Sequence, residues 1–137
     1  MLRRILGPAV LLALVVAACA GDEGSPSAPA DGPVVATFQV VGGERFRVLL
    51  TDPADIADAR RLVAGEDAPS IPNGVVIRGE TGVNEGWSWS LDPDQFEFAD
   101  ITMEVCDGLP SDVEGGIITS DRYCPWSAII VSLDPAG

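Results

Sequence analysis

The sequence predicts an α+β fold: a single small domain built on a mainly antiparallel sheet of about six strands, with one packed helix and one disulfide. Three observations predict it. Short segments of alternating apolar and polar residues recur along the chain, separated by Gly, Pro and Asp, as is typical of antiparallel strands. Residues 52–65 have helical periodicity with signals at both ends. The 137 residues are enough for one domain at most.

The first 18 residues have the layout of an export signal. Arg3 and Arg4 precede an apolar run over residues 5–18, which is short for a membrane span. Residues 16–19, Val-Ala-Ala-Cys, resemble the bacterial lipobox, where the signal peptide is cut before a cysteine that carries lipid. The resemblance implies that 1–18 is a lipoprotein signal peptide and that Cys19 is lipidated. Cleavage by ordinary signal peptidase around Ala18 or Ala20 is the alternative.

Residues 19–33 join this predicted lipidation site to the domain. They are small, polar and rich in proline, so they cannot bury a core and are expected to form a flexible tether. The folded α+β domain is expected to span residues 34–137. Acyl chains on Cys19 would hold that domain on the outer side of the bacterial cell membrane.

The first predicted elements are a hairpin and a helix. Over residues 34–51, Phe and Val alternate with polar residues on either side of Gly42-Gly43, which supplies the turn. In residues 52–65, Asp52 is a good N-cap and Pro53 suits the first helical position. An apolar stripe follows at residues 56, 59, 62 and 63, and Gly65 is expected to end the helix.

Shorter elements are predicted in the second half of the chain. Residues 68–74 and 80–86 are expected to be loops on either side of a short strand at 74–79. Strands follow at 87–91 and 101–106, with a turn at 92–95 and an extended piece at 96–98. Residues 111–114 suggest a capping box and a short helical turn, and residues 127–133 a closing strand.

The cysteine count predicts a disulfide. An exported chain with three cysteines leaves one without a partner, and lipidation of Cys19 would account for it. Cys106 and Cys124 then remain to pair in an oxidising compartment. A redox-active or metal-bound pair is the alternative, although the chain has neither a CxxC spacing nor a histidine to support it.

Charge and missing residue types exclude several classes of function. Without its first 18 residues the chain keeps six arginines and 21 acids, a net charge of −15 that disfavours nucleic acid as a partner. The absence of histidine excludes a Ser-His-Asp triad, and the absence of lysine excludes a Schiff base. Carboxylates and one tyrosine remain as chemically active groups, and no cofactor or metal is predicted.

Carboxylates could still serve two kinds of site. Glycoside hydrolysis needs two of them at a set separation, and five acids are candidates: Asp92, Asp94, Glu97, Glu104 and Asp107. Calcium would need several oxygens to converge, from residues such as Asp94, Asp100, Asp107 and Asp112. Because acids are spread along the whole chain, the favoured interpretation is that they are solvated and form turns.

The tryptophans are expected to belong mainly to the core. Trp87 and Trp89 would share one face of a strand, where they could form a stacking platform if exposed. The core interpretation is favoured because the chain has only eight aromatic residues with which to fill its interior. Trp126 is expected to pack beside the disulfide.

The order of motifs resembles a known domain family. These motifs include N-x-x-W-S-W-x-L-D-P at 84–93, E-V-C-D-G at 104–108 and Y-C-P-W at 123–126. They are similar to the amino-terminal domain of a slime-mould calmodulin-binding protein family, which also occurs in many uncharacterised secreted proteins. The resemblance covers roughly residues 34–133 and points to a set of pattern residues without a known catalytic role: Asn84, Trp87, Trp89, Asp92, Glu104, Cys106, Asp107, Pro110, Cys124, Pro125 and Trp126.

Calmodulin itself is not expected as a partner, because it is acidic and grips basic helices. The leading hypothesis is a membrane-anchored extracytoplasmic lipoprotein with a non-enzymatic binding domain, whose ligand is an envelope protein or glycan. Its candidate binding residues come from the family pattern: Asn84, Trp87, Trp89, Asp92, Glu104, Asp107 and Trp126. The alternatives are a carboxylate-based hydrolase of envelope glycans and a small protease inhibitor, which would need an exposed extended loop such as residues 79–86.

Overall fold

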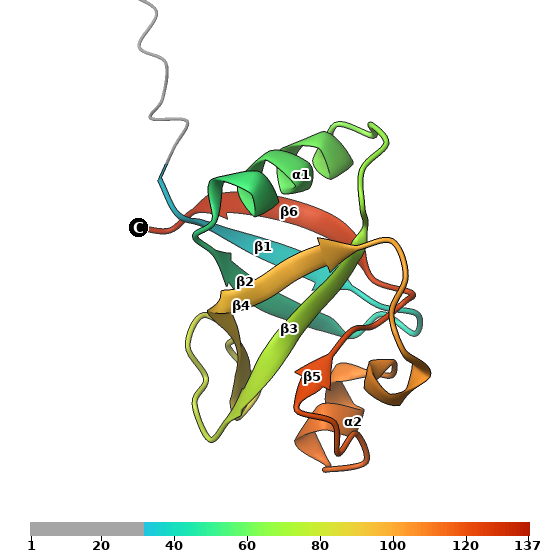
Figure 1. The fold of residues 1–137 in the computed structure, drawn as a ribbon. Helices are drawn as coiled ribbons and strands as arrows, with labels where there is room; N and C mark the ends of the chain where they lie inside the picture. Colours follow the sequence, from blue (N-terminus) through green and yellow to red (C-terminus); the bar gives the residue numbers. More distant parts are fainter. Residues whose placement is uncertain (1–31) are drawn as a thin grey trace, which may run out of the picture.

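The computed structural model describes residues 32–137. The predicted signal peptide, the lipidation of Cys19 and nearly all of the tether therefore lie outside the described residues. Within residues 32–137, no helix is both long and apolar enough to cross a membrane. The described chain forms two three-stranded antiparallel sheets, one main helix and two short helical turns (Figure 1). The α+β prediction with about six strands is confirmed.

The first sheet contains the predicted hairpin. Strands β1 (Val34–Gln39) and β2 (Arg45–Leu50) pair antiparallel, and β6 (Ile129–Pro135) pairs with the other edge of β1, giving the order β2-β1-β6. Gly42 and Gly43 both have positive φ, at 89° and 94°, which explains why glycine occupies the turn. The hairpin and the closing strand are therefore confirmed.

Helix α1 (Pro53–Val63) covers β6, as predicted from its periodicity (Figure 1). The Asp52 carboxylate accepts a hydrogen bond from the Ala54 amide at 2.7 Å, which caps the first turn. Ile56 and Ala59 are buried against the sheet. Gly65 follows the helix with φ of 75°, the left-handed conformation expected after a helix end.

The second sheet differs from the prediction at two places. Strand β3 (Ile71–Arg78) begins inside the predicted loop 68–74, and β4 (Trp89–Ala99) runs through the predicted turn at 92–95. The register moves from Leu91 opposite Val76 to Phe96 opposite Gly74, so residues 92–95 form a bulge within β4. Asp92 Oδ1 accepts from the Asp94 amide at 2.9 Å, so the predicted turn chemistry is satisfied locally without ending the strand.

The predicted strand at 101–106 is wrong. This segment is a loop followed by the 3-10 helix η1 (Glu104–Cys106), and the place beside β3 is taken by the two-residue strand β5 (Arg122–Tyr123). The alternation of apolar residues suggested a buried face, but Ile101, Met103 and Val105 have no strand to pair with and stand in solvent. Helix α2 (Pro110–Glu114) follows, and its box acid is Asp112, which accepts from the Leu109 amide; Ser111 does not cap it.

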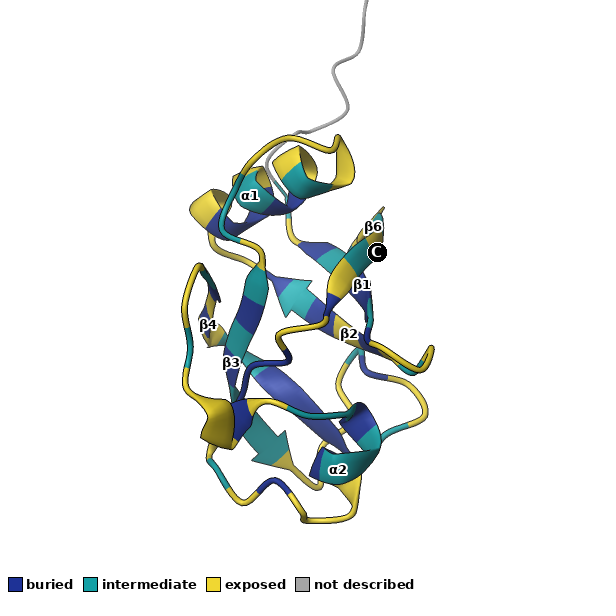
Figure 2. Cartoon of the chain, turned by 90° about the vertical axis from the view of Figure 1, so that its right-hand side faces the viewer, coloured by how far each residue is buried: buried dark blue, intermediate teal, exposed yellow. Residues whose placement is uncertain are grey.

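An aromatic cluster joins the two sheets. Phe38 stacks on Phe46 at 5.1 Å between ring centroids, and Tyr123 meets Phe46 at 5.3 Å and Trp89 at 5.4 Å. All four rings are at most 1% exposed, in the dark-blue interior of Figure 2. The core interpretation of Trp89 is therefore confirmed.

Asp55 is a buried acid in the first turn of α1. Burial raises its pKa from 3.8 to about 6; a hydrogen bond from the Phe98 backbone lowers it, and the charges of Asp52, Asp58 and Glu97 raise it further. Because the folded pKa lies above the unfolded one, the stability that protonation of Asp55 contributes is fully present below about pH 3.8 and is lost as pH rises through about 6.

We therefore expect Asp55→Asn, which keeps an acceptor but carries no charge, to stabilise the domain at pH 7 by about 1–3 kcal/mol. Urea titrations at pH 4.5 and pH 7 measure the effect. The variant should lose the fall in stability between these two values, whereas the exposed Asp121→Asn variant should keep it. An unchanged pH profile in Asp55→Asn would contradict the prediction.

Candidate functional site

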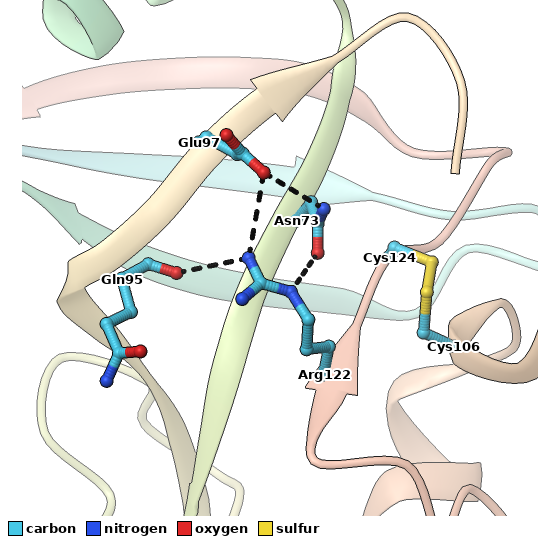
Figure 3. A network of polar contacts seen from close by, with 6 residues as sticks. All are labelled: Asn73, Gln95, Glu97, Cys106, Arg122 and Cys124. Carbon is cyan, nitrogen blue, oxygen red and sulfur yellow. Dashed lines mark hydrogen bonds and ion pairs between the residues drawn. A yellow bond between two sulfur atoms is a disulfide. The ribbon is translucent and has the colours of Figure 1, made fainter. Parts of the chain in front are cut away.

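The disulfide organises the region that the sequence singled out. Cys106 and Cys124 are bonded, with their Cα atoms 5.0 Å apart, and the Cys124 amide donates to the Cys106 carbonyl at 2.7 Å. Both cysteines are buried, and the bridge lies beside β5 (Figure 3). The predicted pairing is confirmed, and the bridge joins the end of η1 to the segment that leads into β6.

Three acids near the bridge hold backbone amides. Glu44 accepts from the amide and the hydroxyl of Ser111, at 2.9 and 2.7 Å. Asp107 accepts from the Trp126 amide at 2.8 Å, and Asp112 from the Leu109 amide at 2.9 Å. These carboxylates therefore stabilise the fold of the bridged segment.

Tyr123 lies beneath these acids. It is completely buried, and its hydroxyl donates to the Gly108 carbonyl at 2.9 Å. Burial raises the pKa of the phenol well above its usual range, and the negative charges of Glu44, Asp107 and Asp112 raise it further. The phenol consequently stays protonated and acts as a hydrogen-bond donor within the core.

The other candidate residues fall into two structural roles. Asn84 is fully buried; its Oδ1 accepts from the Arg47 amide at 2.8 Å and its Nδ2 donates to the Trp89 carbonyl at 2.9 Å. Trp87 is partly buried, and its indole Nε1 donates to the Arg45 carbonyl at 2.8 Å. Asp92 holds the bulge of β4. These side chains stabilise the ends of strands and do not gather with Glu104, Asp107 and Trp126 around the bridge.

A polar network that sequence reasoning missed crosses the second sheet (Figure 3). Arg122 on β5 donates to Asn73 Oδ1 on β3 at 2.8 Å and to the Gln95 carbonyl on β4 at 3.4 Å. Its guanidinium also lies 3.8 Å from Glu97, which is 64% exposed. The network holds the short strand β5 in place, and its residues come from three distant parts of the chain, so no local pattern indicates it.

Exposed apolar side chains surround the bridge. Ile101, Met103 and Val105 are 89%, 69% and 65% exposed, and Trp126 is 45% exposed. Two hydrogen bonds connect this group to the β1–β2 turn: the Trp126 indole donates to Thr102, and the Val41 amide donates to Ser127. We call this region the distal apolar surface, and define it by six residues: Val41, Ile101, Met103, Val105, Trp126 and Ile129.

The distal apolar surface lies at the end of the domain away from its first strand residue. In the first sheet Val34 pairs with Leu50 and Pro135, whereas Gln39 at the other end of β1 pairs with Arg45 and Ile129. Figure 2 views this far end, where η1 and the β1–β2 turn appear as exposed ribbon. Sequence reasoning missed this surface, because it assigned residues 101, 103 and 105 to one face of a strand.

Metal ligands do not converge within the part of the chain that the structure describes. No three Cys, Asp or Glu side chains between residues 32 and 137 are placed to hold an ion. The calcium alternative that was built on Asp94, Asp100, Asp107 and Asp112 therefore finds no site there.

Removing the Glu44 carboxylate tests the structural role of the acids. We expect Glu44→Ala to destabilise the domain by about 1–2 kcal/mol, because the Ser111 amide and hydroxyl lose a charged acceptor. Glu44→Gln keeps one acceptor and should cost less. The exposed Glu104→Ala variant should leave the melting temperature unchanged, and equal losses in Glu44→Ala and Glu104→Ala would refute this assignment.

A comparison with protein families agrees with this architecture. The family model that matches describes the N-terminal domain of the calmodulin-binding protein whose motifs the sequence resembles, and it covers residues 32–137, the residues of the two sheets and the bridge. Searches of the curated proteins and of the solved structures found no match. The family match extends over most of the chain, and the chain belongs to this calmodulin-binding protein N-terminal domain family.

Proposed function

We propose that this chain is a lipid-anchored extracytoplasmic lipoprotein whose domain binds a partner in the bacterial cell envelope and performs no chemistry. The sequence supports the anchor, through Arg3 and Arg4, the apolar run and the lipobox that ends at Cys19. It also supports the disposition of the cysteines, since Cys106 and Cys124 are bonded and leave Cys19 as the third.

The exposed apolar residues around the bridge carry the binding proposal. Soluble domains seldom leave several large apolar side chains together in solvent unless these residues contact something. Here Ile101, Met103 and Val105 are exposed within five consecutive residues that are tied to the bridge and to Trp126. The arrangement is suited to an interaction surface.

The alternatives have less support from the geometry. A hydrolase needs carboxylates that are free to face a substrate, whereas Glu44, Asp107 and Asp112 are hydrogen-bonded to backbone amides. An inhibitor needs an extended loop, whereas residues 79–88 fold into successive turns: the Asn84 amide donates to Thr81 and the Trp87 amide to Asn84. Binding through the distal apolar surface therefore remains the favoured function.

The proposed partners are the membrane, reached through lipid on Cys19, and an envelope protein or glycan. Nucleic acid and calmodulin are disfavoured on electrostatic grounds, because residues 32–137 contain 18 acids against six arginines. The main helix α1 carries Asp55 and Asp58 in its first two turns and does not have the basic face that calmodulin grips.

Metabolic labelling with an alkyne fatty acid tests the anchor. The full chain expressed in a bacterial host should take up label and sediment with membranes, and Cys19→Ser should lose both properties. A Cys19→Ser chain that is still labelled would contradict lipidation at this residue.

A pull-down with paired turnover assays tests the binding role. The chain from Ala20 to Gly137 should capture an envelope component from a detergent extract that an unrelated acidic domain of equal size does not capture. Incubation with envelope glycans should release no product. Turnover that disappears in Glu104→Gln would assign the domain to the hydrolases and overturn the proposal.

A further inference from the structure

We infer that the distal apolar surface is the docking site for a basic protein segment, which inserts one apolar side chain and surrounds it with Lys or Arg. This inference rests on the proposed binding function and assigns that function a surface and a partner chemistry. It depends on three features of the described residues: a fixed apolar patch, shallow depressions of side-chain size, and acidic neighbours.

The patch is held in place by its surroundings. Cys106 at the end of η1 is bonded to Cys124, and the Trp126 indole donates to Thr102 in the middle of the apolar loop. The Trp126 amide is in turn held by Asp107. An apolar patch that is already ordered loses little conformational freedom on binding, which favours affinity.

Two depressions adjoin Ile129. One, of about 270 Å³, lies between the β1–β2 turn and residues 127–129. The other, of about 180 Å³, is lined by Leu62, Ser70 and Ile130. Both are smaller than the roughly 300–1,000 Å³ of small-molecule sites. They suit single side chains of a protein partner, as at the apolar centre of an interface.

Acids determine the charge of the partner. Asp100 and Glu104 are exposed and alternate with Ile101, Met103 and Val105 along the loop. Residues 32–137 as a whole carry a formal net charge of −12, from 18 acids and six arginines. A partner with Lys or Arg around its apolar anchor would be attracted and correctly oriented by this field.

The same charges disfavour the other occupants. A second copy would bring a further −12 to the interface, and an anionic lipid surface would also be repelled. Residues 20–31 of this chain contain only small residues, proline and acids, so they offer no large apolar anchor. A basic partner protein is the occupant that fits both the apolar patch and its acidic neighbours.

A random peptide library tests the inference without requiring the natural partner. Phage-displayed 12-residue peptides are selected on the immobilised chain from Ala20 to Gly137 at low ionic strength. The enriched peptides should carry net positive charge and at least one large apolar residue. Their affinity, measured by calorimetry on synthetic peptides, should fall roughly tenfold for the double variant Met103→Ser, Val105→Ser. Charge reversal by Asp100→Lys with Glu104→Lys should weaken binding by a similar factor.

Ile117→Ser is the matched control, since Ile117 is 75% exposed but follows α2, whose far side is bonded to Arg78 at the end of β3. This variant should bind as the wild type does. All variants change exposed side chains, so equal melting temperatures will show that folding is unaffected.

Several outcomes would overturn the inference. They are a lack of enriched peptides, enrichment of acidic or neutral peptides, and equal binding to the Met103→Ser, Val105→Ser variant. Self-association in sedimentation that this variant abolishes would identify a second copy as the occupant. Binding to phosphatidylglycerol vesicles that it abolishes would identify lipid. If the pull-down still captures an envelope component through another surface, the proposed function stands and only the docking surface is wrong.

Discussion

Reduction of the Cys106–Cys124 bridge is expected to lower the melting temperature of the domain by about 15 °C. The bridge closes a loop with a sequence separation of 18, and a loop of that length restricts the unfolded chain by roughly 3 kcal/mol. That is a large part of the roughly 5–15 kcal/mol that usually stabilises a domain. One kcal/mol shifts the melting temperature of a domain of this size by about 4–8 °C.

Calorimetric scans of the chain from Ala20 to Gly137, with and without dithiothreitol, measure this effect. The double variant Cys106→Ser, Cys124→Ser should melt at the lower temperature in both buffers, which controls for other effects of the reductant. If dithiothreitol leaves the wild-type transition in place, the bridge does not stabilise the fold.

Asn84→Ala is expected to destabilise the domain by about 3 kcal/mol. The Asn84 amide is completely buried and serves two backbone groups, the Arg47 amide on β2 and the Trp89 carbonyl on β4. Alanine leaves both without their partner, and each unsatisfied buried group costs roughly 1–3 kcal/mol. Because the side chain links the two sheets, the variant should also unfold the loop between β3 and β4.

Urea unfolding of Asn84→Ala and of its neighbour Glu85→Ala tests this prediction. Glu85 is 81% exposed and meets only the half-exposed Arg47, at 3.4 Å, so its removal should change stability little. Asn84→Asp should also destabilise, since a carboxylate oxygen would face the Trp89 carbonyl. Equal stability of the Asn84→Ala and Glu85→Ala variants would show that the Asn84 hydrogen bonds are unimportant.

Family membership indicates a shared scaffold more than a shared ligand. Most residues of the family pattern are buried within the domain, among them Asn84, Trp89, Cys106, Pro110, Cys124 and Pro125. The two most exposed apolar residues of the loop, Ile101 and Met103, are not part of that pattern. The proposed ligand surface is thus formed largely by the part of the chain that the scaffold leaves in solvent.

The elements that the sequence predicted correctly depend on local signals. The β1–β2 hairpin needs a turn that only glycine adopts easily, and Gly42-Gly43 provides it. Helix α1 has its cap, its first proline and its apolar stripe within 14 consecutive residues. The disulfide also followed from the sequence, because the cysteines were few enough to assign by counting.

The sequence could not determine which segment would occupy the place beside β3. The loop at 101–106 and the short strand at 122–123 were both candidates by composition, and pairing with β3 depends on contacts between residues about 50 positions apart. The bridge and the Arg122 network select β5, and they leave residues 101–105 unpaired. Sequence alone thus specified the hairpin, the helix and the pairing of the cysteines; the exposure of Ile101, Met103 and Val105 was set by long-range packing, because burial depends on which neighbours the rest of the chain supplies.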